Sequence, residues 1–245
     1  MSGAYRNQAL AALFVGVLAL AGCAGRPARE APPAASAPST APATEGPQAA
    51  GVRREGRAYH VVPEDSLLTV LVFRGGALAK AGHNHVIASH TLSGTAWVPE
   101  DESLASFEIH APVNDFTIDE PPLRALEGKD FASDVPDSAR EGTRKNMLSE
   151  PMLDGARYPE IVLSSGPLER GPEGMLAQVN VGIRGQTRTF TVPIRYEVKG
   201  NELSAQGQLA LKQTDLGLTP FSLLGGALHV EDEMTVKFSV VARAE

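Results

Sequence analysis

Two histidines, His83 and His85, stand one residue apart and form the densest group of reactive side chains in this sequence. In an extended chain, residues two apart point to the same face, so both imidazoles would lie together with Asn84 opposite. Two imidazoles so placed could share a Zn²⁺, Cu²⁺ or Fe²⁺ ion, or act as an acid and a base. They could also hydrogen-bond the polar head group of a ligand, or simply bond to the backbone of a turn.

A metal ion at this pair would need a third and a fourth ligand. His90 has the wrong parity to share the same strand face. Asp115, Asp119 and Glu120 lie in a later acidic insertion, but nothing in the sequence places them near the histidines. All four interpretations of the pair therefore stay open.

Other catalytic patterns are missing from the sequence. It contains no Gly-x-Ser-x-Gly, no phosphate-binding Gly-Lys-Ser/Thr loop and no His-Glu-x-x-His, and no cofactor is expected. The net charge of −7 argues against nucleic-acid binding, because no basic stripe is available to neutralise phosphates.

Residues 1–22 have the pattern of a signal peptide. Arg6 supplies a positive region, and Ala9 through Ala19 form an apolar core that is too short to span a membrane. Leu20-Ala21-Gly22-Cys23 resembles the lipobox of bacterial lipoproteins, in which the cysteine is lipidated and becomes the first mature residue. By the same resemblance, Ala24 after the cysteine implies the periplasmic face of the outer membrane. Cys23 is the only cysteine, so no intrachain disulfide can form.

Residues 23–57 are rich in Ala, Pro, Ser, Thr and Gly and show no apolar periodicity. This composition predicts a disordered tether that lets a folded domain stand off the membrane. The folded domain then covers residues 58–245.

The folded part alternates between apolar and polar residues, which predicts strands with one buried face. About eight or nine antiparallel strands are expected, closed into a barrel or stacked as a sandwich. Small inward residues would leave an apolar cavity, whereas large aromatic ones would fill it, and the pattern alone leaves both open. The expected strands cover 59–62, 67–74, 86–98, 106–113, 161–165, 177–183, 189–198, 203–211 and 235–240.

An insertion between Asn114 and Tyr158 interrupts the alternation. Helices are expected at Leu123–Glu127 and from Asp137 or Ser138 to about Glu150. An apolar stripe there is expected to plug or flank one end of a barrel, either as core packing or as the lining of a ligand entrance. The stripe consists of Met147, Leu148, Met152 and Leu153.

The order of these features resembles the YceI-like family of periplasmic lipid-binding proteins. The resemblance is carried by Tyr59 through Ser66, by Arg144 through Leu148 followed by Tyr158-Pro159-Glu160-Ile161, by Gly182 through Arg188, and by Leu211 through Leu218. It spans about Tyr59 to Val241. It implies an all-β fold, an eight-stranded antiparallel lipocalin-like barrel with the helical insertion at one end. It also implies that the barrel binds a polyisoprenoid chain.

The leading hypothesis is therefore a membrane-anchored periplasmic binding protein, not an enzyme, that holds an isoprenoid or similar apolar lipid. The competing hypothesis is a metal-dependent or acid/base enzyme centred on His83 and His85, which otherwise sit at the barrel rim as candidates for head-group contact. The inward residues expected to line the ligand site are Phe107, Ile109, Val179, Phe190, Ile194, Tyr196 and Phe238, with Met147 and Leu148 near one end.

Overall fold

The computed structural model describes residues 54–171 and 174–245 of the 245-residue chain. The predicted signal peptide, Cys23 and the tether as far as residue 53 lie outside the described residues.

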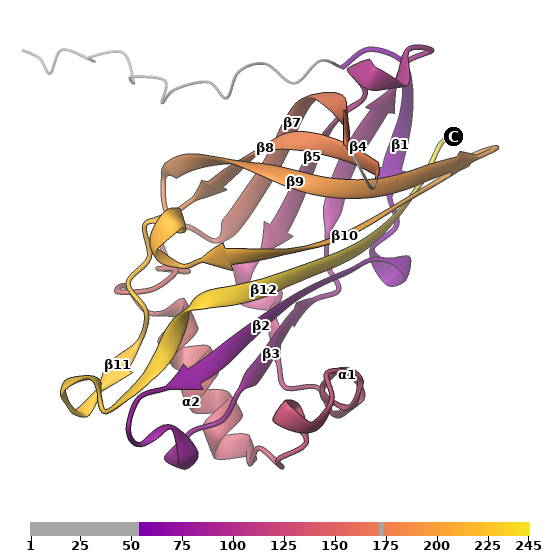
Figure 1. The fold of residues 1–245 in the computed structure, drawn as a ribbon. Coiled ribbons are helices and arrows are strands. Elements are labelled where there is room, and N and C mark those ends of the chain that lie inside the picture. Colours follow the sequence, from indigo (N-terminus) through magenta and orange to yellow (C-terminus); the bar gives the residue numbers. More distant parts are fainter. Residues whose placement is uncertain (1–53, 172–173) are drawn as a thin grey trace, which may run out of the picture. The chain divides into compact units, whose positions relative to one another are not determined.

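Eight antiparallel strands close into a barrel, which confirms the predicted fold class. Around the barrel the order is β1-β4-β5-β7-β8-β9-β10-β12, and β12 returns to β1 through the pair Val61 and Ala242 (Figure 1). The strands are β1 (Arg57–Val61), β4 (Ser93–Val98), β5 (Ser106–Pro112), β7 (Glu160–Gly171), β8 (Gly174–Ile183), β9 (Gln186–Lys199), β10 (Glu202–Lys212) and β12 (Leu228–Arg243).

Three of the barrel strands, β1, β4 and β5, are next in sequence to further strands that extend the sheet. β2 (Leu67–Gly75) follows β1 after a short 3-10 turn, and the long β12 pairs with both of them. β3 (His85–Ser89) precedes β4 and pairs with β2, and β6 (Thr117–Ile118) follows β5 and pairs with β3. β11 (Ser222–Leu223) forms a small hairpin with β12.

The single strand expected over residues 86–98 is instead two strands, β3 and β4. Between them Leu92 turns inward and is 2% exposed. Just after the kink, Gly94 has φ +135°, and a Cβ at this position would lie 2.1 Å from the Glu108 carbonyl oxygen. The kink lets one continuous segment pair with β2 at one end of the barrel and with β1 and β5 at the other.

The insertion forms two α-helices, α1 (Pro121–Leu126) and α2 (Asp137–Leu148), near the expected positions. A proline starts α1, and Asp137 lies in the first turn of α2, where its charge complements the helix dipole. α2 contacts β6 and α1 contacts β3. None of the helices in the described part of the chain combines the length and the apolar character needed to cross a membrane.

Candidate ligand-binding site

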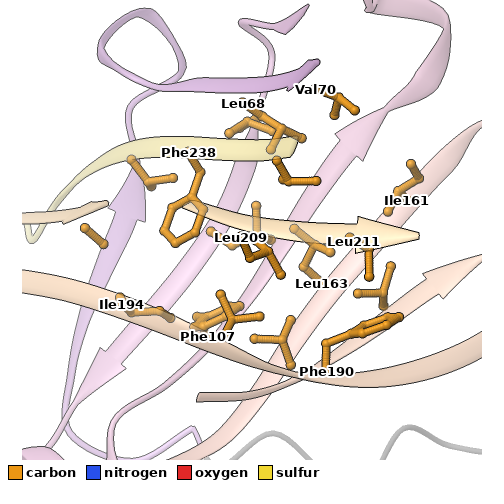
Figure 2. Close-up of a pocket in the computed structure, with 18 of the residues that line it drawn as sticks. Leu68, Val70, Phe107, Ile161, Leu163, Phe190, Ile194, Leu209, Leu211 and Phe238 are labelled. Atoms are coloured by element: carbon orange, nitrogen blue, oxygen red, sulfur yellow. The ribbon is translucent and has the colours of Figure 1, made fainter. Parts of the chain in front are cut away.

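The inner face of the barrel encloses an apolar cavity of about 300 Å³. All eight barrel strands contribute to its wall, because inward residues alternate with outward ones on each strand. In the described part of the chain, the polar residues of the wall are Ser106, Tyr196 and Gln213. Figure 2 shows the side chains of Leu68, Val70, Ile161 and Leu163 on the cavity wall, together with aromatic and branched aliphatic side chains from other strands.

The wall is long relative to the volume that it encloses. Leu203 and Leu211 both line the cavity and are eight residues apart on β10, which corresponds to about 26 Å along a strand. A volume of about 300 Å³ distributed over that length describes a narrow channel rather than a round pocket. Such a channel suits an extended apolar chain.

Three phenylalanines project their rings into the cavity: Phe107, Phe190 and Phe238 (Figure 2). Phe238 lies across Gly207 of the neighbouring strand, since a Cβ at Gly207 would lie 2.4 Å from its ring and 2.5 Å from the Pro193 carbonyl oxygen. The glycine therefore leaves the space that the Phe238 ring occupies. The aromatic residues narrow the cavity without filling it, which settles the alternative that the sequence left open.

One end of the cavity is lined by α2 and the turn that follows it. Met147, Met152 and Leu153 belong to the wall. The turn folds back on the helix, because the amides of Leu153 and Gly155 donate to the carbonyls of Met147 and Leu148 at 3.0 and 3.1 Å. The apolar stripe predicted from the sequence thus lies at one end of the barrel.

Toward the other end, Tyr196 of β9 joins the cavity wall to the segment before β5. Its hydroxyl donates to the Glu102 carboxylate at 3.0 Å. Burial, together with this hydrogen bond and the charge of Glu102, raises the pKa of Tyr196 to about 12. The phenol therefore stays neutral at physiological pH.

Most of the predicted lining residues lie on the wall, and three do not. Leu148 packs with the core residues around Met147 behind the wall. His83 and His85 are not part of the wall either. The residues on the wall are Phe107, Ile109, Met147, Val179, Phe190, Ile194, Tyr196 and Phe238.

The wall also includes residues that the sequence analysis did not single out. On β2, Leu68, Val70 and Val72 face the cavity, while Leu71 packs outward against Phe131 of the insertion. Because both faces of β2 are covered, its sequence is almost continuously apolar, and no alternation marks the inward residues. Leu216 and Leu218, in the loop after β10, also line the cavity. A loop has no regular alternation of apolar and polar residues, so the sequence did not mark them as inward.

His85 belongs to a buried polar cluster beside the α2 end of the cavity. Its Nδ1 lies 2.6 Å from Asp119 Oδ2, and its Nε2 lies 3.3 Å from the Thr143 hydroxyl. Thr143 is one helical turn before Met147, which lines the cavity. Asp119 comes from the acidic insertion and is 34 residues from His85, so the sequence could not reveal this pairing.

Asp119 holds the cluster together. Its Oδ1 accepts hydrogen bonds from the Val86 amide at 2.9 Å and from Arg124 at 2.6 Å. Burial alone would raise the pKa of Asp119, but the bonds from His85, Val86 and Arg124 outweigh it and hold the pKa below its ordinary value. Arg124 also donates to the carbonyls of Asn84 and Ser133, so its buried charge is fully compensated.

His83 differs from His85 in having a buried Nδ1 with no hydrogen-bond partner. Its ring centroid is 6.2 Å from that of His85. Burial lowers the pKa of His83, and the nearby Arg124 and Arg74 guanidinium groups lower it further, against the opposing effect of Asp119. Within residues 54–171 and 174–245, no group of three or more His, Cys, Asp or Glu side chains is arranged to hold a metal ion.

Three comparisons place this geometry among known proteins. A family profile described as YceI-like domain matches residues 59–242. BcnA of Burkholderia cenocepacia has a TM-score of 0.53 at 16% identity, over 74% of this chain and 99% of that one. A polyisoprenoid binding domain from Saccharophagus degradans, implicated in plant cell wall breakdown, has a TM-score of 0.52 at 12% identity, over 77% and 99%. No curated protein matches this chain. Because the sequence identities are this low, the similarity of this chain to the two structures shows a shared fold only.

Proposed function

This chain belongs to the YceI-like family, and from that premise we propose that its barrel binds a long apolar chain of the polyisoprenoid class. The observation that carries the proposal is the narrow apolar channel, whose wall spans the barrel from Leu203 to Leu211. The Saccharophagus degradans domain, which has the same fold and binds polyisoprenoid, supports this ligand class.

The energetics of the channel favour a long ligand over a short one. Each buried methylene contributes about 0.8 kcal/mol, and association costs on the order of 4–15 kcal/mol of lost freedom. Roughly 5 to 19 buried carbon units are therefore needed to offset the cost of association, which a long chain supplies and a short one does not. The wall offers few hydrogen-bond partners, so the length and width of the ligand would determine selectivity more than its head group.

The protein acts as a carrier or store in this proposal, and no bond is made or broken. It is anchored through lipidated Cys23 at the periplasmic face of the outer membrane. Residues 24–57 connect the anchor to the barrel. The lipobox pattern and the composition of these residues support this location.

The test is mass spectrometry of organic extracts from the purified full chain, with a matched pair of variants. Ala205→Phe inserts a ring into the cavity, whereas Ala210→Phe places the same ring on the exposed face of the same strand. The wild type and Ala210→Phe are expected to carry a polyisoprenoid, and Ala205→Phe is expected to lose it.

Metal analysis of the same samples addresses the competing hypothesis of an enzyme centred on His83 and His85. A stoichiometric transition metal together with an extract free of lipid would contradict the proposed function. Equal lipid content in both phenylalanine variants would show that the ligand lies outside the cavity.

A further inference from the structure

Three exposed leucines gather on two neighbouring loops at one end of the barrel. Leu78 follows β2 and is 46% exposed, while Leu223 and Leu224 at the β11 turn are 47% and 74% exposed. The loops are joined, since the Leu78 amide donates to the Ala227 carbonyl at 2.8 Å. We call Leu78, Leu223 and Leu224 the leucine tip.

The backbone holds Leu224 outward at a cost in strain. Its φ is +51°, a conformation that leucine rarely adopts, and Gly225 and Gly226 continue the turn with φ of +66° and +94°. An asparagine or glycine would adopt this conformation more easily. Because the Leu224 side chain is three-quarters exposed, it contributes little to the core. Neither core packing nor backbone preference therefore accounts for a leucine at this position.

Within the two loops that carry the leucine tip the charged side chains are cations, and the nearest carboxylate is that of Glu231, which lies against Gly75 at the end of β2. Residues 73–85 and 216–230, which form the two loops, contain no aspartate or glutamate, and the first contains Arg74 and Lys80. The chain as a whole carries −7. Glu231 begins the acidic surface just past the second loop and lies 3.7 Å from His229. Apolar side chains flanked by cations match the interface of a bilayer that contains anionic lipids.

The leucine tip lies at the α2 end of the cavity. Leu218 lines the cavity five residues before Leu223. Figure 1 shows β11 and the turn after β2 at the same end of the barrel as α2. A surface held against the bilayer here would bring the cavity end close to the apolar phase.

We propose that the leucine tip inserts into the interface of an anionic lipid bilayer and places the α2 end of the cavity there to take up or release its ligand. The docking itself depends only on the leucine tip, whereas the transfer rests on the proposed function. The proposed partner is an anionic lipid surface, so vesicles that contain anionic lipid test the docking directly.

The test uses the full chain with Trp97, its only tryptophan, replaced by phenylalanine. Leu224→Trp then reports from the leucine tip, and Leu126→Trp reports from α1, where Leu126 is 78% exposed. With phosphatidylglycerol vesicles, the emission of Leu224→Trp should shift to the blue and be quenched by brominated acyl chains. Leu126→Trp should show neither change. An N-terminal lipid anchor is common to both variants and cannot produce the difference.

A second measurement separates docking from ligand binding. Leu224→Glu should slow transfer of a fluorescent polyprenyl ligand between vesicles about tenfold, since one buried leucine is worth about that factor. Leu126→Glu should transfer at the wild-type rate, and both should retain the same ligand on extraction. Absence of a blue shift at Leu224→Trp overturns the proposal. So does a shift that appears without vesicles as protein concentration rises, which would identify a second copy as the partner.

Discussion

Asp119 illustrates how one side chain determines local structure in this protein. It is 1% exposed and joins β3, β6 and α1 through bonds with His85, the Val86 amide and Arg124. Because the folded state lowers its pKa, its contribution to stability is present above its ordinary pKa of 3.8 and is lost as pH falls through the lower folded value.

Asp119→Asn should destabilise the protein by about 3–5 kcal/mol, because it leaves the buried Arg124 without its counter-charge. Urea unfolding at pH 7 measures the change in the free energy of unfolding. Asp115→Asn is the matched control, since Asp115 lies in the same insertion and is exposed. Equal stability of the two variants would show that the cluster is not structural.

His110, on the outer face of the barrel, should make the stability of the protein depend on pH. A hydrogen bond from its Nδ1 to Glu160 at 3.0 Å raises the pKa of His110, and Glu108 adds to the effect. The resulting stabilisation is fully present below the unfolded pKa of about 6.5 and is lost as pH rises through the higher folded pKa.

Glu160→Gln should therefore lower the pKa of His110, as followed by NMR titration of the imidazole. Glu169→Gln on the same strand, where Glu169 is exposed, should leave it unchanged. A pKa of His110 that is the same in all three proteins would contradict the assignment.

Among the secondary-structure elements, α2 determines where the cavity ends. On this helix the Thr143 hydroxyl contacts His85, and one turn later the Met147 side chain lines the cavity. The length of ligand that the barrel accepts should depend on this element.

Met147→Ala should lengthen the cavity and shift the bound lipids toward longer chains, as measured by mass spectrometry of extracts. The variant should also lose about 2–5 kcal/mol of stability, as buried methionine truncations do. Met147→Leu nearly conserves the volume and should retain both the wild-type lipids and most of the stability. A lipid profile unchanged in Met147→Ala would place the ligand away from α2.

At the scale of the whole molecule, closure of the barrel removes the exposed edges that a flat sheet would present. β12 achieves this by pairing with β10 on one side and with β1 and β2 on the other. The barrel provides an apolar interior. In the proposed function, its place in the cell depends on the predicted lipobox at Cys23.

Cys23→Ser should release the protein from the membrane fraction, because lipid chains on the cysteine would supply the anchor. Fractionation of cells and detection of the full chain measure this. Wild-type protein that is already soluble, or a variant that stays in the membrane fraction, would contradict lipidation.

Sequence patterns predicted the strands best where one face is buried and the other wet. On β10 the polar residues Ser204, Gln206 and Gln208 alternate with the inward set, and the structure places Leu203, Ala205, Leu209 and Leu211 on the cavity wall. On β2 the insertion covers the outer face, so the alternation disappears and its inward residues were missed. The sequence also did not predict the kink at Leu92, because the kink depends on β3 pairing with β2 and β4 pairing with β5.

The sequence by itself determined the all-β class, the position of the helical insertion and most of the inward positions, because side-chain alternation is a local property of the backbone. Only the tertiary structure decided that the phenylalanines leave a channel open, and that Asp119 lies beside His85. It also brought Leu78 next to the β11 turn. These features depend on contacts between residues far apart in the chain, which strand pairing and barrel closure create and no local pattern records.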